Sequence, residues 1–169
     1  MFEAPVLDPI VFAALHERVE GEGVPGDLDR LGDLLHSPDG AFRYELAGGE
    51  TGQGRPELSL RLEGHLVLAC QRCLGPLPFV LDVSTRLVLV QNEEALPGLE
   101  DEEQGVDVIV APDRLSVVDL VEEEILLALP LVPVHSEGSC VSPVGEGVGR
   151  PSSPFGALAG LKSSAGKKD

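Results

Sequence analysis

Three cysteines and one histidine form the most chemically informative pattern in this sequence. Cys70 and Cys73 are separated by two residues, and His135 and Cys140 follow about sixty residues later. Two thiols at this spacing, joined by an imidazole and a third thiol, are a suitable ligand set for a tetrahedral soft metal ion. Because the four residues would fill every position, the pattern predicts a closed, structural zinc site rather than a catalytic one.

Two other interpretations of the thiol pair stay open. Cys70 and Cys73 can be small apolar residues buried at the end of a hairpin, with Cys140 at the start of a tail. They can also form a redox pair. A reactive Cys-x-x-Cys usually opens a helix, which lowers the thiol pKa, whereas here Gly75 and Pro76 follow at once. The sequence therefore favours redox chemistry least.

Arg72, between the two thiols, is a cation on an otherwise acidic chain. Its charge could neutralise a thiolate, form a salt bridge with a neighbouring acid, or contact RNA or a carboxylate of a partner. We predict Arg72 as a partner-binding residue.

The predicted secondary structure places the thiol pair at the tip of a hairpin. Leu58 to Cys70 and Phe79 to Leu89 both alternate apolar and polar residues, which predicts two long antiparallel strands. Gly64 predicts a bulge or bend in the first of them. An earlier strand begins at Ala41, and residues 48–56 read as a mobile, glycine-rich turn.

Helices are expected at the start and late in the chain. Asp8 caps a helix that begins at Pro9 and continues to Val19, and a second short helix begins at Asp27. Residues 37–40 form a turn. Ser116 caps a helix, with Asp119 completing a capping box, and Pro130 ends it. We expect this helix to pack across the sheet. Consecutive carboxylates on a helix diverge, so residues 122–124 are expected to form a solvated face rather than an ion site, with Glu124 paired with a neighbouring group.

The fold class predicted from these elements is α+β: an antiparallel, hairpin-built sheet that curls toward a small, partly closed barrel, with flanking helices. Residues 93–104 form an acidic loop before a short strand at 106–110. We predict one domain over residues 1–140 and a disordered tail over 141–169. Within the tail, residues 154–162 are a candidate docking segment, whose partner-binding residues are Phe155, Leu158, Leu161 and Lys162.

The charge of the chain limits its partners. The formal net charge is -17 over 169 residues, and all three lysines lie at the C-terminal end. Affinity for nucleic acid comes largely from Lys and Arg that displace counterions, so broad contact of the body with bare RNA is unfavourable. No apolar run is long enough to cross a membrane and no secretory signal is visible, which predicts a cytoplasmic protein without a membrane partner.

The sequence resembles the YceD family of bacterial and plastid proteins, which are linked to accumulation of large-subunit ribosomal RNA. The likeness rests on Cys70-Gln71-Arg72-Cys73 with Pro76, on Asp119-Leu120-Val121-Glu122 with the run to Leu129-Pro130, and on Pro133-Val134-His135 followed by Cys140. It implies a role in synthesis, processing or stability of 23S rRNA and supplies no catalytic mechanism.

Together these observations predict a non-enzymatic factor in large ribosomal subunit biogenesis. Because the chain is acidic, its partner is expected to be a ribosomal protein or assembly factor with a basic surface, and contact with 23S rRNA to be indirect or weak. The alternatives are a thiol oxidoreductase, a metal-dependent nuclease acting on precursor RNA, and a zinc-stapled adaptor with no link to RNA. A nuclease would need convergent carboxylates or histidines in a positively charged cleft.

Overall fold

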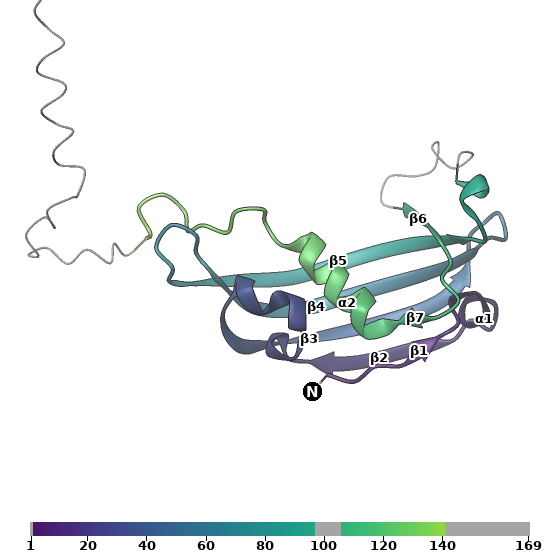
Figure 1. Ribbon diagram of the computed structural model, residues 1–169, viewed down its shortest axis with the longest axis horizontal. Coiled ribbons are helices and arrows are strands. Elements are labelled where there is room, and N and C mark those ends of the chain that lie inside the picture. Colours follow the sequence, from purple (N-terminus) through teal and green to yellow (C-terminus); the bar gives the residue numbers. More distant parts are fainter. Residues whose placement is uncertain (1, 97–105, 141–169) are drawn as a thin grey trace, which may run out of the picture.

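The computed structural model describes residues 2–96 and 106–140 of the chain, and within them it shows a five-stranded sheet and a separate two-stranded ribbon (Figure 1). The predicted tail at 141–169 and most of the acidic loop lie outside these residues. The strands are β1 Val6–Leu7, β2 Arg18–Gly23, β3 Leu35–Glu50, β4 Pro56–Ala69, β5 Pro76–Val90, β6 Val106–Val110 and β7 Leu115–Ser116. The α-helices are α1 Pro9–Ala14 and α2 Val117–Ala128, and the 3-10 helices are η1 Pro25–Asp27, η2 Asp29–Leu34 and η3 Glu93–Ala95.

The sheet has the order β2-β3-β4-β5-β6, and β1 pairs with β7. The predicted α+β class and the two long antiparallel strands are confirmed, because β4 and β5 pair as antiparallel neighbours, and β3 pairs with β4 in the same way. The barrel prediction is wrong: β2 and β6 are the two edges of an open sheet. The strand at 106–110 is present, but β6 runs parallel to β5. Residues 91–105 separate these two strands, a connection long enough for parallel pairing.

Alternation along β4 creates the core. Leu58, Leu60, Leu62, Leu66 and Leu68 are at most 1% exposed, whereas the residues between them are less buried. Helix α2 lies across this leucine face (Figure 1), and the two together form one aliphatic cluster. The strands therefore have one buried and one solvated face, as expected for a half-covered antiparallel sheet.

Helix α2 starts and ends where the sequence predicts. The side chain of Ser116 accepts a hydrogen bond from the backbone N–H of Asp119, and the helix ends two residues before Pro130. The expectation that residues 122–124 form a solvated face is wrong for Glu122 and Glu124, although the partner expected for Glu124 is present. Glu122 and Glu124 are 5% and 8% exposed. Glu122 accepts a hydrogen bond of 2.6 Å from the backbone N–H of Arg30, and Glu124 accepts one of 2.6 Å from the hydroxyl of Thr85.

The N-terminal helices are shorter than predicted. Asp8 caps α1 as expected, but α1 ends at Ala14, and the last two residues assigned to the helix, Arg18 and Val19, begin β2. The strand was not predicted because glycines interrupt its apolar alternation. A Cβ added at Gly21 would lie 2.6 Å from the ring of Tyr44 on β3, so that ring occupies the place of a β2 side chain. The segment predicted as an α-helix from Asp27 forms the 3-10 helix η2, which directly follows η1.

Gly64 does not mark a bulge. It pairs in continuous register with Phe42 and Leu81, and a Cβ there would lie 2.4 Å from the carbonyl oxygen of Ala41. Close approach of the neighbouring strand requires glycine at this position. The register instead shifts between Leu35 and Gly40, so the predicted turn at 37–40 is an irregular part of β3. The glycine-rich turn is also shorter than predicted, because β3 continues to Glu50 and β4 begins at Pro56.

Candidate metal centre

The turn between β4 and β5 carries the first two cysteines. Ala69 and Pro76 are the last residues of the strand pairing, so residues 70–75 close the hairpin. The backbone N–H of Cys70 donates to the carbonyl of Gly75 at 3.0 Å, and that of Leu74 donates to Cys70 at 2.8 Å. Cys70 is fully buried at the end of the leucine face, and Cys73 is half-buried. The predicted position of the thiol pair at a hairpin tip is therefore confirmed.

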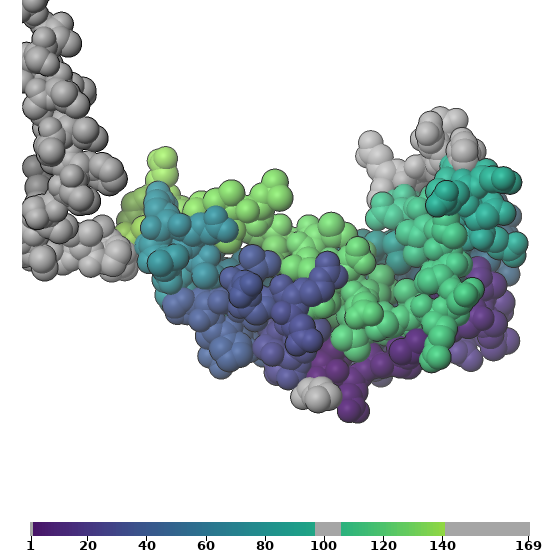
Figure 2. Space-filling view, viewed as in Figure 1, coloured from purple at the N-terminus to yellow at the C-terminus, as the bar shows by residue number. Residues whose placement is uncertain are grey.

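The second pair of candidate ligands reaches this turn along the segment that follows α2. The carbonyl of Pro133 accepts a hydrogen bond of 2.8 Å from the backbone N–H of Gln71. After His135 the chain reverses at Gly138, which has a φ of 82°, and this reversal returns Cys140 to the turn. Figure 2 shows the teal residues of the β4–β5 turn beside the lime-green residues of this last segment, at one end of the molecule.

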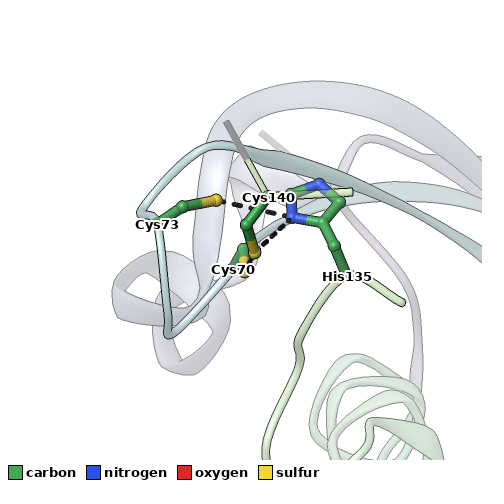
Figure 3. A group of neighbouring side chains, drawn as sticks. All are labelled: Cys70, Cys73, His135 and Cys140. Carbon is green, nitrogen blue, oxygen red and sulfur yellow. Dashed lines mark hydrogen bonds between the residues drawn. The ribbon is translucent and has the colours of Figure 1, made fainter. Parts of the chain in front are cut away.

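The four side chains point toward one another (Figure 3), and their ligand atoms all lie within 4.8 Å of each other. The Sγ atoms of Cys70 and Cys140 are 3.8 Å apart, and the Nδ1 atom of His135 lies 3.4 Å from Cys73 Sγ and 3.6 Å from Cys140 Sγ. A tetrahedral zinc ion with ordinary bond lengths separates two sulfurs by about 3.8 Å and a sulfur and a nitrogen by about 3.6 Å. The cluster therefore has the dimensions of a tetrahedral site.

A hydrogen bond orients the His135 ring as a metal ligand. Its Nε2 atom lies 2.9 Å from the carbonyl oxygen of Pro76, which can only accept, so Nε2 carries the proton. The lone pair of a neutral ring is then on Nδ1, the atom that faces the thiols. A carbonyl that orients a histidine in this way is a common support of metal ligands. Pro76 was not predicted as a functional residue, because a backbone carbonyl leaves no residue-type signal.

Arg72 also points into the cluster. Its Nε atom donates to Cys140 Sγ at 3.0 Å, and one terminal guanidinium nitrogen donates to the carbonyl oxygen of His135 at 2.8 Å. The side chain starts between the first two cysteines and contacts both residues of the second pair. Its predicted contact with a partner stays a prediction, while this inward contact is a geometric fact.

The thiols and the imidazole shift one another's pKa. Burial raises the pKa of Cys70, but hydrogen bonds from the backbone of His135, Cys73 and Arg72 outweigh it and lower the pKa to about 5. A backbone hydrogen bond from Gly75 lowers the pKa of Cys73, yet burial and the other two cysteines raise it above its usual value. The pKa of His135 is raised, first by its hydrogen bond with Cys140 and then by the Pro76 carbonyl. The lowered pKa favours the thiolate form of Cys70, and the thiolate is the form that ligates a metal ion.

Of the three interpretations of the cysteines, the geometry favours the metal site. The three thiols are free and do not form a disulfide. Thiols buried only as small apolar residues need neither an oriented imidazole nor a guanidinium, and both are present here. A redox pair usually opens a helix, and Cys70 and Cys73 lie instead in a strand-to-strand turn. A ligand set with four positions filled suits a metal ion that stabilises structure.

Among residues 2–96 and 106–140, this is the one cluster of His, Cys, Asp and Glu that could hold a metal ion. The remaining predicted site residues, Phe155, Leu158, Leu161 and Lys162, lie outside the described part of the chain. No helix among the described residues is long and apolar enough to cross a membrane.

Comparison with known proteins identifies relatives that share this region. The sequence model of a family described as "Large ribosomal RNA subunit accumulation protein YceD" matches residues 58–162, a range that includes all four candidate ligands. A curated protein of that name from Haemophilus influenzae is 30% identical over 103 residues, which are 56% of this chain and 59% of the relative. The chain thus spans about three fifths of that relative's length. No solved structure matches. Because the family model covers more than half of the chain, the protein belongs to the YceD family.

Proposed function

We propose that this chain is a non-enzymatic, cytoplasmic factor in large ribosomal subunit biogenesis that supports the accumulation of 23S rRNA. The observation that carries the proposal is the family match over residues 58–162, which includes the whole candidate metal centre. The related protein from Haemophilus influenzae carries ribosomal RNA accumulation in its name. Two of the three consecutive carboxylates on α2, Glu122 and Glu124, accept structural hydrogen bonds from Arg30 and Thr85, which supports a structural rather than a catalytic role for those two residues.

The experiment is a depletion of the chain in its own cells, followed by measurement of the ratio of 23S to 16S rRNA. We expect the ratio to fall and to recover when the wild-type chain is supplied. A variant with Cys73→Ser tests whether the metal centre is needed for that recovery. An unchanged ratio after complete depletion would refute the proposal. Turnover of RNA or of a disulfide by the purified chain, abolished by Cys73→Ser, would replace it with an enzymatic function.

The second part of the proposal is a structural zinc ion held by Cys70, Cys73, His135 and Cys140. The support is the agreement between the interatomic distances and a tetrahedron of sulfur and nitrogen ligands. Elemental analysis of protein purified without a metal-affinity step is expected to give about one zinc per chain. Less than about a tenth of an equivalent, with all three thiols freely titratable, would remove zinc from the proposal.

The third part concerns the partner. A net charge of -17 disfavours direct contact with the phosphate backbone and favours a protein with a basic surface, such as a ribosomal protein or assembly factor. We propose that Phe155, Leu158, Leu161 and Lys162 add a short anchoring segment. A pull-down from extract should retain the same proteins after nuclease treatment, and Phe155→Ala with Leu158→Ala should weaken that retention. Loss of every partner on RNA digestion would show that RNA is the direct contact.

A further inference from the structure

The four ligands do not balance the charge of the proposed zinc centre. Three thiolates, a neutral imidazole and a divalent ion together leave a net charge of about −1. Cys70 is fully buried, so part of this charge lies away from water. A buried, unbalanced charge is costly, and a cation beside the thiolates would offset it.

Arg72 is placed to supply that cation. Its Nε–H is directed at Cys140 Sγ, with 3.0 Å between the heavy atoms, and this is a charge-assisted hydrogen bond when Cys140 is a thiolate. The same guanidinium donates to the carbonyl oxygen of His135 at 2.8 Å. The backbone of Arg72 belongs to the β4–β5 turn, whereas both acceptors belong to the segment after α2. One side chain therefore joins the two halves of the ligand set.

The shape of the side chain matters as well as its charge. A guanidinium presents several N–H groups in a fixed plane, so it can bind a sulfur and a carbonyl oxygen at once. A lysine ammonium carries the same charge but lacks this fork. A hydrogen bond to a thiolate also withdraws electron density from the sulfur, which lowers its reactivity toward electrophiles.

We propose that Arg72 is a positioning residue of the metal centre: it balances the charge of the zinc–thiolate complex and holds and shields Cys140. This inference rests on the proposed zinc site. Arg72 is the residue of the turn that was predicted to contact a partner, and this proposal gives it a supporting role at the metal centre instead. The affinity for zinc and the reactivity of Cys140 should then depend on Arg72, although Arg72 does not ligate the ion.

The test compares the wild-type chain with Arg72→Gln, Arg72→Lys and the control Arg43→Gln. The control removes the same charge from the surface of β3, where Arg43 forms an exposed ion pair with Glu22. Zinc affinity is measured by competition with a chromophoric chelator. The reaction rate of each thiol with an alkylating agent is measured in the zinc-loaded protein by peptide mass spectrometry. The absorption spectrum of the cobalt-substituted protein reports whether the ligand set is unchanged.

We expect Arg72→Gln to weaken zinc binding by about 10- to 100-fold, the usual effect of removing a support of a metal ligand. Cys140 should be alkylated faster, relative to Cys70, than in the wild-type chain. The zinc affinity and the Cys140 alkylation rate of Arg72→Lys should lie between those of the wild type and Arg72→Gln. Both quantities in Arg43→Gln should match the wild type. The tetrahedral cobalt spectrum should persist in all four proteins, because the four ligands remain.

Three results would overturn the inference, and they can be told apart. Wild-type protein that binds neither zinc nor cobalt refutes the metal centre itself, and with it the role of Arg72. Wild-type protein that binds zinc, with Arg72→Gln within about twofold of its affinity and unchanged in Cys140 reactivity, refutes the role of Arg72 alone. If Arg72→Gln does not fold, Arg72→Lys decides by the same two measurements, and equality with the wild type refutes the inference.

Discussion

The two turns that flank β4 close hairpins of the same sheet in different ways. Residues 51–55, between β3 and β4, are held by bonds within the turn itself. The backbone N–H of Thr51 donates to the carbonyl of Arg55 at 2.8 Å, and the hydroxyl of Thr51 accepts from the backbone N–H groups of Gln53 and Arg55. Gly54, with a φ of 76°, supplies the left-handed conformation that such a turn requires.

The other turn, residues 70–75, depends on residues distant in the sequence. Two backbone hydrogen bonds lie within it, but Gln71 also donates to Pro133, and His135 donates to Pro76. The thiols of Cys70 and Cys73 face the second pair of ligands. The contrast indicates that a short segment suffices to form the first turn, whereas the second is completed only when the chain after α2 has docked.

Removal of the proposed metal ion should produce the largest effect, and only at the second turn. We expect His135→Ala to abolish zinc binding and to lower the thermal midpoint by on the order of 10 °C, since a ligand that binds only the folded state stabilises it. Hydrogen exchange should become faster in peptides covering 66–77 and 129–140 and stay unchanged in 48–58. The control is His65→Ala, because His65 is an exposed histidine of β4 outside the cluster.

Equal acceleration of exchange in residues 48–58 would contradict the comparison. It would show that both turns belong to one cooperative unit with the metal centre, rather than to a locally closed turn and a turn that needs a distant segment.

A second long-range contact offers a test that does not involve metal. Glu122 on α2 is buried and accepts the hydrogen bond from the backbone of Arg30 at the start of η2. Glu122→Ala leaves this N–H without its partner, and we expect a loss of about 1.5–3 kcal/mol in the free energy of unfolding. Glu123→Ala, at the exposed neighbouring position, should change it by less than about 0.5 kcal/mol.

Urea unfolding of the zinc-loaded proteins measures both changes. Zinc stoichiometry should be unaffected in either variant, because Glu122 and Glu123 lie outside the ligand set. Loss of zinc from Glu122→Ala would show that the seating of α2 and the metal centre are coupled.

The locally closed turn should respond more weakly. Thr51→Ala removes a hydroxyl that accepts hydrogen bonds from Arg55 at 3.1 Å and from Gln53 at 3.3 Å. We expect a loss of about 0.5–1.5 kcal/mol in the free energy of unfolding, with zinc affinity unchanged. Thr51→Ser keeps the hydroxyl and should retain most of the stability. An equal loss in both variants would show that the methyl group, not the hydroxyl, matters in this turn.

Much of the second turn could be predicted from the sequence because its signals are side chains. The alternating leucines of β4 predicted the strand, and the spacing of the thiols predicted that Cys70 and Cys73 lie at a hairpin tip. The sequence also predicted His135 and Cys140 as ligands, although no local pattern showed how the chain brings them back to the hairpin tip. The hydrogen bond from Gln71 to Pro133 that brings them back is formed by backbone atoms, which are the same for every residue type.

The fold was predicted least well where small residues or long connections decide the structure. Gly21 and Gly23 leave β2 without an apolar alternation, because rings from β3 occupy that face of the strand. Nothing in the five residues of β6 fixes its direction, because a short apolar run can pair with its neighbour in either orientation. The burial of Glu122 depends on an N–H group of a residue far away in the sequence, so its charge alone suggested solvent exposure.

Leu74 should give the smallest effect, and one of opposite sign. It has a φ of 58°, a left-handed conformation that costs a residue with a Cβ roughly 1–2 kcal/mol, and its side chain is 74% exposed. Leu74→Gly removes that strain but adds roughly 0.5–1 kcal/mol of chain entropy to the unfolded state. We therefore expect a net gain of up to about 1 kcal/mol in urea unfolding, with zinc affinity unchanged. Leu74→Ala keeps the strain and serves as the control. If Leu74→Gly instead lost stability and zinc together, the exposed leucine would have to hold the turn in the shape that the thiols need.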